Sequence, residues 1–327
     1  MAVILPRTLP AAARLRADGH DVADEPMPVD GTGLHPRALT VVLVNLMPDK
    51  ASVEADFGRL LADGGQDVRL LLAVPEGYVT TATPADHMAR FYRPFFDLPL
   101  ARIDAVIVTG APVETLPFDH VFYWDGLRRI LDWLDSALVP SLHVCWGAQA
   151  AMFHYHGVDK HPLRRKRFGL YPHMPLGSGH GLLTGIELPF HMPVSRHAET
   201  RLEDLVRRPG LRPVLTAPVA GVGLVRDRTR PAVYCLNHPE YGPQRLLQEF
   251  TRDRSTGRQI DPPVGYDAAL RRPQVGWQAA ARSLYRNWLT EIAAADPRTS
   301  ADVALDWLLR AQLSGGTAPA GSPCRLQ

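Results

Sequence analysis

Hydrophobic residues along the chain fall into short, nearly continuous runs separated by longer segments with helical spacing. The continuous runs are rich in Val, Leu and Ile and predict strands buried on both faces: 39–47, 67–74, 105–110 and 141–144. The segments between them predict helices: 52–62 with Ser52 as its cap, 87–92 and 119–135. Strands that alternate with helices predict an α/β fold with a doubly wound parallel sheet and right-handed crossovers.

Shorter elements follow in the second half of the chain. The pattern predicts strands at 213–216, 223–226 and 232–236, and helices at 242–254, 275–295 and 300–313. Residues 1–37 are rich in Pro, Ala, Gly and Asp without sustained periodicity, which predicts an extended arm; disorder is an equal alternative for the first residues. The chain is therefore divided into an N-terminal arm (1–37), one α/β domain (38–295) and a C-terminal helix with a flexible tail (296–327).

Composition and charge exclude several classes of partner. The chain has 327 residues, 36 basic and 34 acidic, so a net charge of +2 attracts neither nucleic acid nor a membrane surface. The basic segment 159–167 lacks interleaved aromatic residues and is expected to be a solvated loop with one or two site residues. No apolar run reaches transmembrane length, and Pro6, Arg7 and Pro10 interrupt the opening segment, so we expect no signal peptide and no membrane partner.

Cysteine and histidine usage argues against a disulfide framework and against a bound metal. The three cysteines are odd in number, widely spaced and without a CxxC pair, which fits a reducing, cytoplasmic compartment. Four histidines, His143, His154, His156 and His161, gather in one region, but no ligand-spaced pair comes with a carboxylate or cysteine motif. We therefore expect no metal and no cofactor.

The stretch 141–153 carries the strongest chemical signal. An apolar run ends at Cys145 and a helix-compatible segment begins at once, with Gly147 where the backbone must approach its neighbours. A strand, a sharp turn and a helix would hold the sulfur at the carboxyl edge of the sheet, where a helix N-terminus favours thiolate. Cys145 is therefore the candidate nucleophile; on this stretch alone, a buried, inert cysteine is an equal alternative.

His238 and Glu240 supply the remaining groups of a triad. They follow the strand predicted at 232–236, and an open α/β sheet binds its ligand beyond strand ends. A cysteine nucleophile needs a base, and the base needs a carboxylate that fixes its tautomer. Pro239 stiffens the turn between them. The alternative is a solvated His-Pro-Glu turn.

These residues also carry a family resemblance. Cys145-x-Gly147-x-Gln149 with the later His238-Pro-Glu240 resembles the class I glutamine amidotransferase fold, which is flavodoxin-like with a nucleophile elbow. The fuller set is similar to the homoserine O-acyltransferases of methionine biosynthesis, whose blocks appear in the same order over about 39–289: 45–50, 109–114, 123–124, 145–149, 166–169, 195–196 and 238–241.

The resemblance implies a function and a set of site residues. It implies ping-pong acyl transfer from acetyl-CoA to L-homoserine, with Cys145 as acyl-thioester nucleophile, His238 as base and Glu240 as its partner. It implies homoserine contacts from Lys166, Ser195 and Arg252, the last suited to a carboxylate because a guanidinium binds it bidentately. In this family, glutamate at the position of Glu114 goes with acetyl transfer and glycine with succinyl transfer. The expected assembly is a homodimer.

The oxyanion of the transition state needs preorganised donors. The expected donors are the backbone N–H group of Trp146 and one from Gly110 or Ala111. Lys50 would add positive charge nearby; a surface lysine after a turn is an equal alternative.

Four alternative functions stay open. The chain departs from the family pattern at Val53, Val194 and 171–173, which leaves serine as an alternative acceptor, and succinyl-CoA is an alternative donor. A glutamine amidotransferase would use the same triad but would leave the blocks around Lys166 and Ser195 unexplained. A non-catalytic binding module would be expected to have lost part of the triad.

Overall fold

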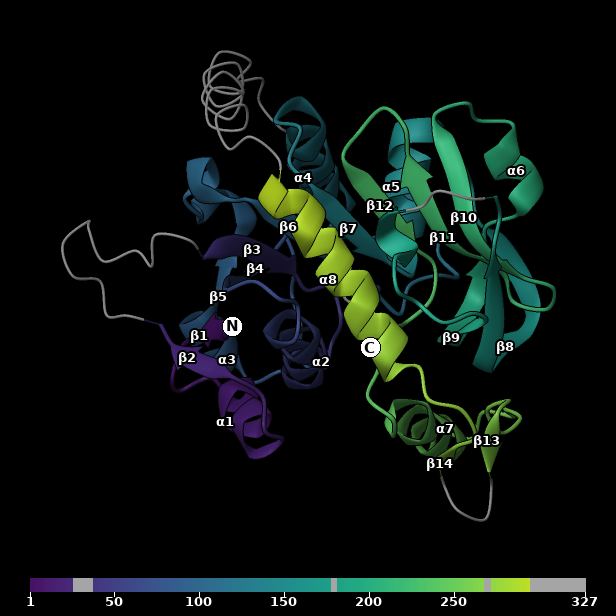
Figure 1. The fold of residues 1–327 in the computed structure, drawn as a ribbon, viewed down its shortest axis with the longest axis horizontal. Coiled ribbons are helices and arrows are strands. Elements are labelled where there is room, and N and C mark those ends of the chain that lie inside the picture. Colours follow the sequence, from purple (N-terminus) through teal and green to yellow (C-terminus); the bar gives the residue numbers. More distant parts are fainter. Residues whose placement is uncertain (26–37, 178–180, 268–271, 295–327) are drawn as a thin grey trace.

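A single twelve-stranded sheet runs through the molecule, with helices on both faces (Figure 1). The computed structural model describes residues 1–25, 38–177, 181–267 and 272–294. Within them the strand order is β2-β1-β4-β3-β6-β7-β12-β11-β10-β8-β9, and β5 also pairs with β4. This architecture is the expected α/β fold with a mostly parallel sheet.

One half of the sheet is parallel. Its strands are β1 (Val3–Leu5), β2 (Val22–Asp24), β3 (Leu39–Val44), β4 (Val68–Val74), β5 (Tyr92–Pro94), β6 (Ala105–Val108), β7 (Ser141–Val144) and β12 (Ala232–Cys235). The central members β3, β6 and β12 are short runs of mostly β-branched or apolar residues, as a strand covered on both faces requires, and β7 buries Ser141 and His143 as a hydrogen-bonded pair. The carboxyl ends of β6, β7 and β12 therefore meet at one edge.

The other half is antiparallel. It begins where β12 pairs with β11 (Gly221–Asp227) and continues through β10 (Leu211–Ala217), β8 (His161–Pro175) and β9 (Phe190–Glu199). Because β12 joins the two halves, the loop that follows it lies beside both β7 and the antiparallel strands.

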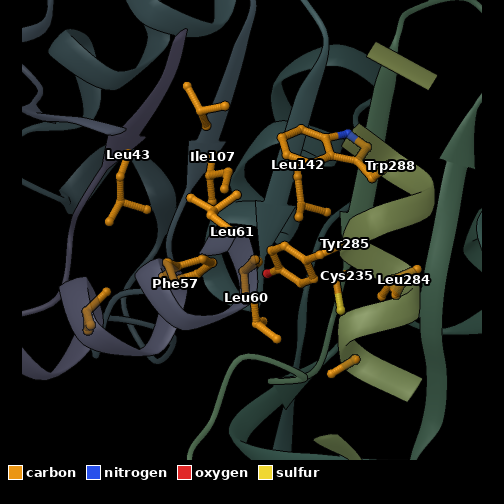
Figure 2. Close-up of a cluster of buried hydrophobic side chains, with 14 of the residues drawn as sticks. Leu43, Phe57, Leu60, Leu61, Ile107, Leu142, Cys235, Leu284, Tyr285 and Trp288 are labelled. Carbon is orange, nitrogen blue, oxygen red and sulfur yellow. The ribbon is translucent and has the colours of Figure 1, made fainter. Parts of the chain in front are cut away.

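Helices pack against both faces of the sheet. On one face lie α1 (Pro10–Ala17), α2 (Lys50–Ala62) and α8 (Gln278–Ala294); on the other lie α4 (Trp124–Ser136) and α5 (Trp146–His156). Figure 2 shows Phe57 and Leu61 of α2 and Tyr285 of α8 against Ile107 and Leu142 of the sheet. Each such side chain stabilises the fold by about 1.5–3 kcal/mol when fully buried.

Smaller helices and a second, two-stranded sheet complete the described chain. They are α3 (Ala85–Phe91), α6 (Leu202–Val206), α7 (Arg245–Ser255), β13 (Tyr266–Asp267) and β14 (Arg272–Pro273). No helix within the described ranges is long and apolar enough to cross a membrane.

Residues 1–25 do not form the predicted extended arm. They make a β1-α1-β2 unit in which both strands join the main sheet, β1 pairing with β4. Val3 and Leu5 are fully buried, and Leu15 packs beneath α2, so this segment is part of the core. Strands of three residues are too short for period or length to reveal them. The rest of the predicted arm (26–37) and the predicted C-terminal helix and tail (296–327) lie outside the described residues.

Two local predictions also differ from the structure. Helix α2 begins at Lys50, and its cap is Asp49, whose side chain accepts a hydrogen bond from the Ser52 N–H. The basic segment predicted as a solvated loop instead leads into the long strand β8, because pairing with β9 satisfies its backbone groups.

Candidate active site

Cys145 sits on a strained turn between β7 and α5. Its backbone has φ 51° and ψ −116°, a left-handed conformation that a non-glycine residue adopts only when its surroundings hold it. The N–H of Cys145 donates to the Cys235 carbonyl at 2.7 Å. Two residues on, a Cβ at Gly147 would lie 2.5 Å from the carbonyl oxygen of Thr109, which is too close for any side chain. The glycine therefore lets α5 approach the end of β6, and the half-buried thiol stands at the sheet edge.

The imidazole of His238 meets Cys145 on one side and Glu240 on the other. Its Nδ1–H donates to Glu240 Oε1 at 2.7 Å, so the other ring nitrogen takes the hydrogen bond with the thiol. If Gly110 carried a Cβ, that atom would lie 3.7 Å from both Cys145 Sγ and His238 Cε1. The thiol and the imidazole therefore border the same small space beside Gly110. The Tyr241 ring stacks on the imidazole with centroids 4.2 Å apart.

Charge around His238 favours its protonated form. Burial alone would lower its pKa, but the neighbouring Cys145 thiolate and Glu240 carboxylate outweigh that effect and raise the pKa well above the usual value. The raised pKa of His238 suits a group that holds and returns a proton beside a cysteine nucleophile.

The predicted oxyanion donors lie around the same turn. Trp146 opens α5, so its N–H has no partner within the helix. Gly110 and Ala111 follow β6 and are buried next to Cys145. That these backbone groups bind the oxyanion stays a prediction.

Lys50 is not a surface lysine, so that alternative is wrong. Its side chain is fully buried, donates to the Asn45 carbonyl and lies with Nζ 4.0 Å from the ring centroid of Tyr78. Burial lowers its pKa to about 7, against the opposing charge of Glu54. The described contacts of Lys50 are with Asn45 and the aromatic rings, so its part in an oxyanion site stays a prediction.

The predicted homoserine contacts gather around a residue that the sequence did not reveal. Ser195 Oγ donates to Glu249 Oε2 at 2.5 Å, and Lys166 Nζ lies 3.3 Å from Glu249 and 2.9 Å from Asp253. The Tyr241 hydroxyl also donates to Glu249, at 2.7 Å. Glu249 thus connects the Lys166–Ser195 cluster to the ring that stacks on His238.

Glu249 stays ionised in this cluster. Burial alone would raise its pKa, but Lys166 and the hydroxyls of Ser195 and Tyr241 lower it below the ordinary value. No motif marks this residue, because its role depends on contacts between α7 and strands distant in sequence. Glu249 lies on the buried face of α7 with Leu246 and Asp253, so a charged residue at the spacing of the buried positions is a weak signal in the sequence.

Arg252 and Glu114 lie at the margin of this region. Arg252 pairs with Asp253 at 2.9 Å, and its side chain is 62% exposed, so the guanidinium is open to a ligand. Glu114 is half-buried. Burial lowers the pKa values of Lys160 and His197, and the charge of Glu114 opposes both shifts, so Glu114 lies near both side chains. The four groups predicted to handle acceptor and donor therefore come from different elements: Lys166 from β8, Ser195 from β9, Arg252 from α7 and Glu114 from the segment after β6.

The clustered histidines do not share a site. Each pairs separately, His143 with Ser141, His154 with Asp132, His156 with Asp227 and His161 with Asp204.

A second carboxylate lies behind the triad. Asp56 of α2 lines the same ≈ 280 Å³ pocket as His238 and Glu240, and Arg59, 3.9 Å from Asp56, donates to the Glu240 carbonyl at 2.6 Å. Burial raises the pKa of Asp56 from 3.8 to about 6, although Arg245 and Arg59 oppose the shift. Glu240 adds to the rise, so the two acids resist being ionised together.

We expect Asp56→Asn to change how stability depends on pH. The folded chain binds a proton at Asp56 more tightly than the unfolded chain, so the wild type loses stability as pH rises through the window from 3.8 to about 6. Asparagine mimics the protonated acid, so its stability relative to wild type should increase by about 2 kcal/mol between about pH 4 and about pH 7.5. Urea unfolding of both proteins at the two pH values measures this; a constant difference would contradict it.

A thiol, an imidazole and a carboxylate at strand ends of a doubly wound sheet define a class I glutamine amidotransferase-like protein with a nucleophile elbow. Solved structures share this fold at low identity. A glutamine amidotransferase from Thermotoga maritima is 13% identical with a TM-score of 0.53, covering 79% of this chain and 99% of that chain. Another from Methylobacillus flagellatus is 13% identical with a TM-score of 0.50, covering 77% and 94%.

Within this class, the chain belongs to the homoserine O-succinyltransferase family, whose model matches residues 2–298. It is similar to proteins named homoserine O-acetyltransferase. The relative from Hyphomonas neptunium is 35% identical over 91% of this chain and 97% of its own length. The relative from Rhizorhabdus wittichii is 39% identical over 91% and 92%. The chain is therefore an acyltransferase, and the resemblance drawn from the sequence blocks is confirmed.

Proposed function

We propose that this protein transfers an acetyl group from acetyl-CoA to the hydroxyl of L-homoserine, through an acyl-thioester on Cys145. The observation that carries the proposal is the thiol on its strained turn, paired with an imidazole whose pKa is raised and beside a cluster suited to an amino acid. Curated relatives named homoserine O-acetyltransferase support the choice of donor and acceptor.

The first half-reaction acylates the enzyme. The Cys145 thiolate attacks the thioester carbonyl, and the N–H groups of Trp146 and of Gly110 or Ala111 stabilise the oxyanion. The carbon–sulfur bond to CoA breaks, and the His238 imidazolium gives its proton to the departing sulfur. His238 is then neutral and ready to act as a base, while Glu240 keeps its tautomer fixed.

The second half-reaction transfers the acyl group to the acceptor. His238 takes the proton of the homoserine hydroxyl as that oxygen attacks the Cys145 thioester, and the thiolate is released. The acceptor also carries a carboxylate and an ammonium group. Arg252 and Lys166 suit the carboxylate, whereas the ionised Glu249 suits the ammonium.

The preference for an acetyl donor depends on Glu114. A carboxylate that faces the acyl group would bring two like charges together when the donor is succinyl-CoA, and it would occupy part of the volume that a succinyl chain needs. An acetyl group presents only a methyl. This argument selects acetyl-CoA over succinyl-CoA.

We expect Glu114→Gly to shift the donor preference toward succinyl-CoA. The ratio of kcat/KM for acetyl-CoA to that for succinyl-CoA should fall by about tenfold or more, because both bulk and charge are removed. Glu114→Gln separates the two effects by removing charge alone, and Asp119→Asn is the matched control on the same loop. Steady-state assays with each donor, paired with homoserine and then with serine, also test the acceptor.

Two results would overturn parts of this proposal. Faster turnover of succinyl-CoA by the wild type would refute the role of Glu114. Glutamine hydrolysis, with no acyl transfer to either amino acid, would indicate the amidotransferase alternative instead.

A further inference from the structure

The hydroxyl group of Thr109 lies between two backbone groups at the carboxyl end of β6, and the reaction described above does not use it. The residue is 2% exposed. Its Oγ1 accepts a hydrogen bond from the Leu46 N–H at 2.8 Å and donates one to the Gly110 carbonyl at 2.9 Å. A threonine hydroxyl has a single hydrogen to donate. In Thr109 that hydrogen is directed to the Gly110 carbonyl.

The backbone of Thr109 is also fixed on two sides. Its N–H donates to the Val44 carbonyl at 3.1 Å, which ties it to the end of β3. Its carbonyl oxygen lies against the first turn of α5, at the position where Gly147 permits close approach. Together with the bond to Leu46, these contacts hold Thr109 in place, so its hydroxyl is a preorganised donor to Gly110.

A bond to the Gly110 carbonyl also sets the direction of the next N–H group. The carbonyl of Gly110 and the N–H of Ala111 belong to one planar peptide unit and point in opposite directions. Gly110 borders the nucleophile, because a Cβ at this position would lie 3.1 Å from Cys145 Cβ and 3.7 Å from its Sγ. The N–H that Thr109 orients therefore belongs to the peptide unit beside the sulfur.

Two backbone N–H groups beside Cys145 are buried without an acceptor. Ala111 is 6% exposed and Trp146 is 0% exposed. Within the part of the chain that the structure describes, neither N–H donates a hydrogen bond. Buried N–H groups without a partner are rare and unfavourable. Their occurrence next to the candidate nucleophile suits a site that receives the oxygen of a reacting acyl group.

We infer that Thr109 is a positioning residue, whose hydroxyl orients the Ala111 N–H toward the oxyanion that forms when Cys145 attacks a carbonyl carbon. The inference rests on the proposed function and deepens it, because only attack on a carbonyl creates an oxyanion. A donor that is already oriented stabilises the transition state without reorganisation. Without the hydroxyl, the peptide unit between Gly110 and Ala111 loses the bond that sets its direction.

The test compares two reactions of the same sulfur. p-Nitrophenyl acetate acylates Cys145: a carbon–sulfur bond forms, the carbonyl oxygen becomes an oxyanion, and p-nitrophenolate leaves as the carbonyl re-forms. Iodoacetamide alkylates Cys145 by displacing iodide from a saturated carbon, so no oxyanion forms. The Cys145→Ala protein is the blank for the other two cysteines in both reactions.

Thr109→Val removes the hydroxyl at nearly constant size. It should slow acylation by about tenfold or more and leave alkylation within about twofold of the wild-type rate. Thr109→Ser keeps the hydroxyl and should acylate within about threefold of the wild type. Thr216→Val is the matched control: Thr216 of β10 also donates to a glycine carbonyl, that of Gly221, but β11 and β12 separate it from β7. It should change neither rate.

Three results would overturn the inference. They are a folded Thr109→Val protein with the wild-type acylation rate, equal slowing of acylation and alkylation, and a Thr109→Ser protein as slow as Thr109→Val. If Thr109→Val does not fold, the smaller Thr109→Ala takes its place, with the same expectations. Neither reagent contains CoA or homoserine, so a failure of the proposed substrates would leave this result standing.

Discussion

Cys145→Ala is expected to abolish acyl transfer, lowering kcat/KM by about 10⁴-fold or more. The Cys145 sulfur is the only group of the protein that forms a bond to the acyl carbon in the proposed reaction, and the backbone donors around Trp146 cannot replace it. The fold should survive, because the half-buried sulfur at the sheet edge contributes little packing. Steady-state assays with acetyl-CoA and homoserine measure the loss.

Mass spectrometry of the intact protein separates this role from a structural one. Brief incubation with acetyl-CoA alone should add one acetyl mass to the wild type and none to Cys145→Ala. Cys145→Ser keeps the size of the side chain and serves as the matched variant, with little or no turnover expected. An acetyl adduct on Cys145→Ala would show that another residue is the nucleophile.

Glu240→Gln is expected to lower kcat by about 10³-fold while leaving the shape of the site intact. The carboxylate accepts a hydrogen bond from the Nδ1–H of His238 at 2.7 Å. It is also one of the two charges that raise the pKa of the imidazole. Glutamine can instead offer its amide N–H to the ring and thereby favour the wrong tautomer. Both half-reactions need the correct tautomer, so both should slow.

Rapid-quench measurement of each half-reaction checks this expectation. The Glu240→Gln protein should form its acetyl adduct slowly and should pass the acetyl group to homoserine slowly as well. A defect confined to the homoserine step would instead place Glu240 with the acceptor. Asp56→Asn is the useful companion, since it changes a neighbouring acid of the same pocket without a hydrogen bond to the imidazole.

The parallel half of the fold could be predicted because its strands must be apolar on both faces. Runs such as 39–47 and 105–110 are apolar almost throughout, which is the pattern of a central parallel strand that is covered on both faces. Strands β8 and β9 were not recognised. They carry several prolines and basic residues, and their pairing with one another, rather than intrinsic preference, makes them strands.

The site residues also differ in how far the sequence could predict them. Cys145, His238 and Glu240 follow strand ends within short motifs, so local sequence was enough to bring them together. Glu249 could not be assigned in this way, because its importance comes from contacts across the fold. For Lys50, the sequence leaves a surface position and a site position equally open; its burial beside Tyr78 excludes the surface position, and a part in the site stays a prediction.

The pairing of β1 with β4 also affects how a growing chain would acquire this structure. Val3 lies opposite Val68, so one side of β1 stays unpaired until α2 and β4 have been synthesised, whereas β2 can pair with its other side earlier. During that interval its apolar side chains are open to other chains. Helix α1 follows β1 directly in the chain. Its Leu15 belongs to the same buried cluster as Leu5 of β1, so α1 can cover part of β1 early. The β1-α1-β2 unit can therefore join the sheet only after β4 is available to pair with β1.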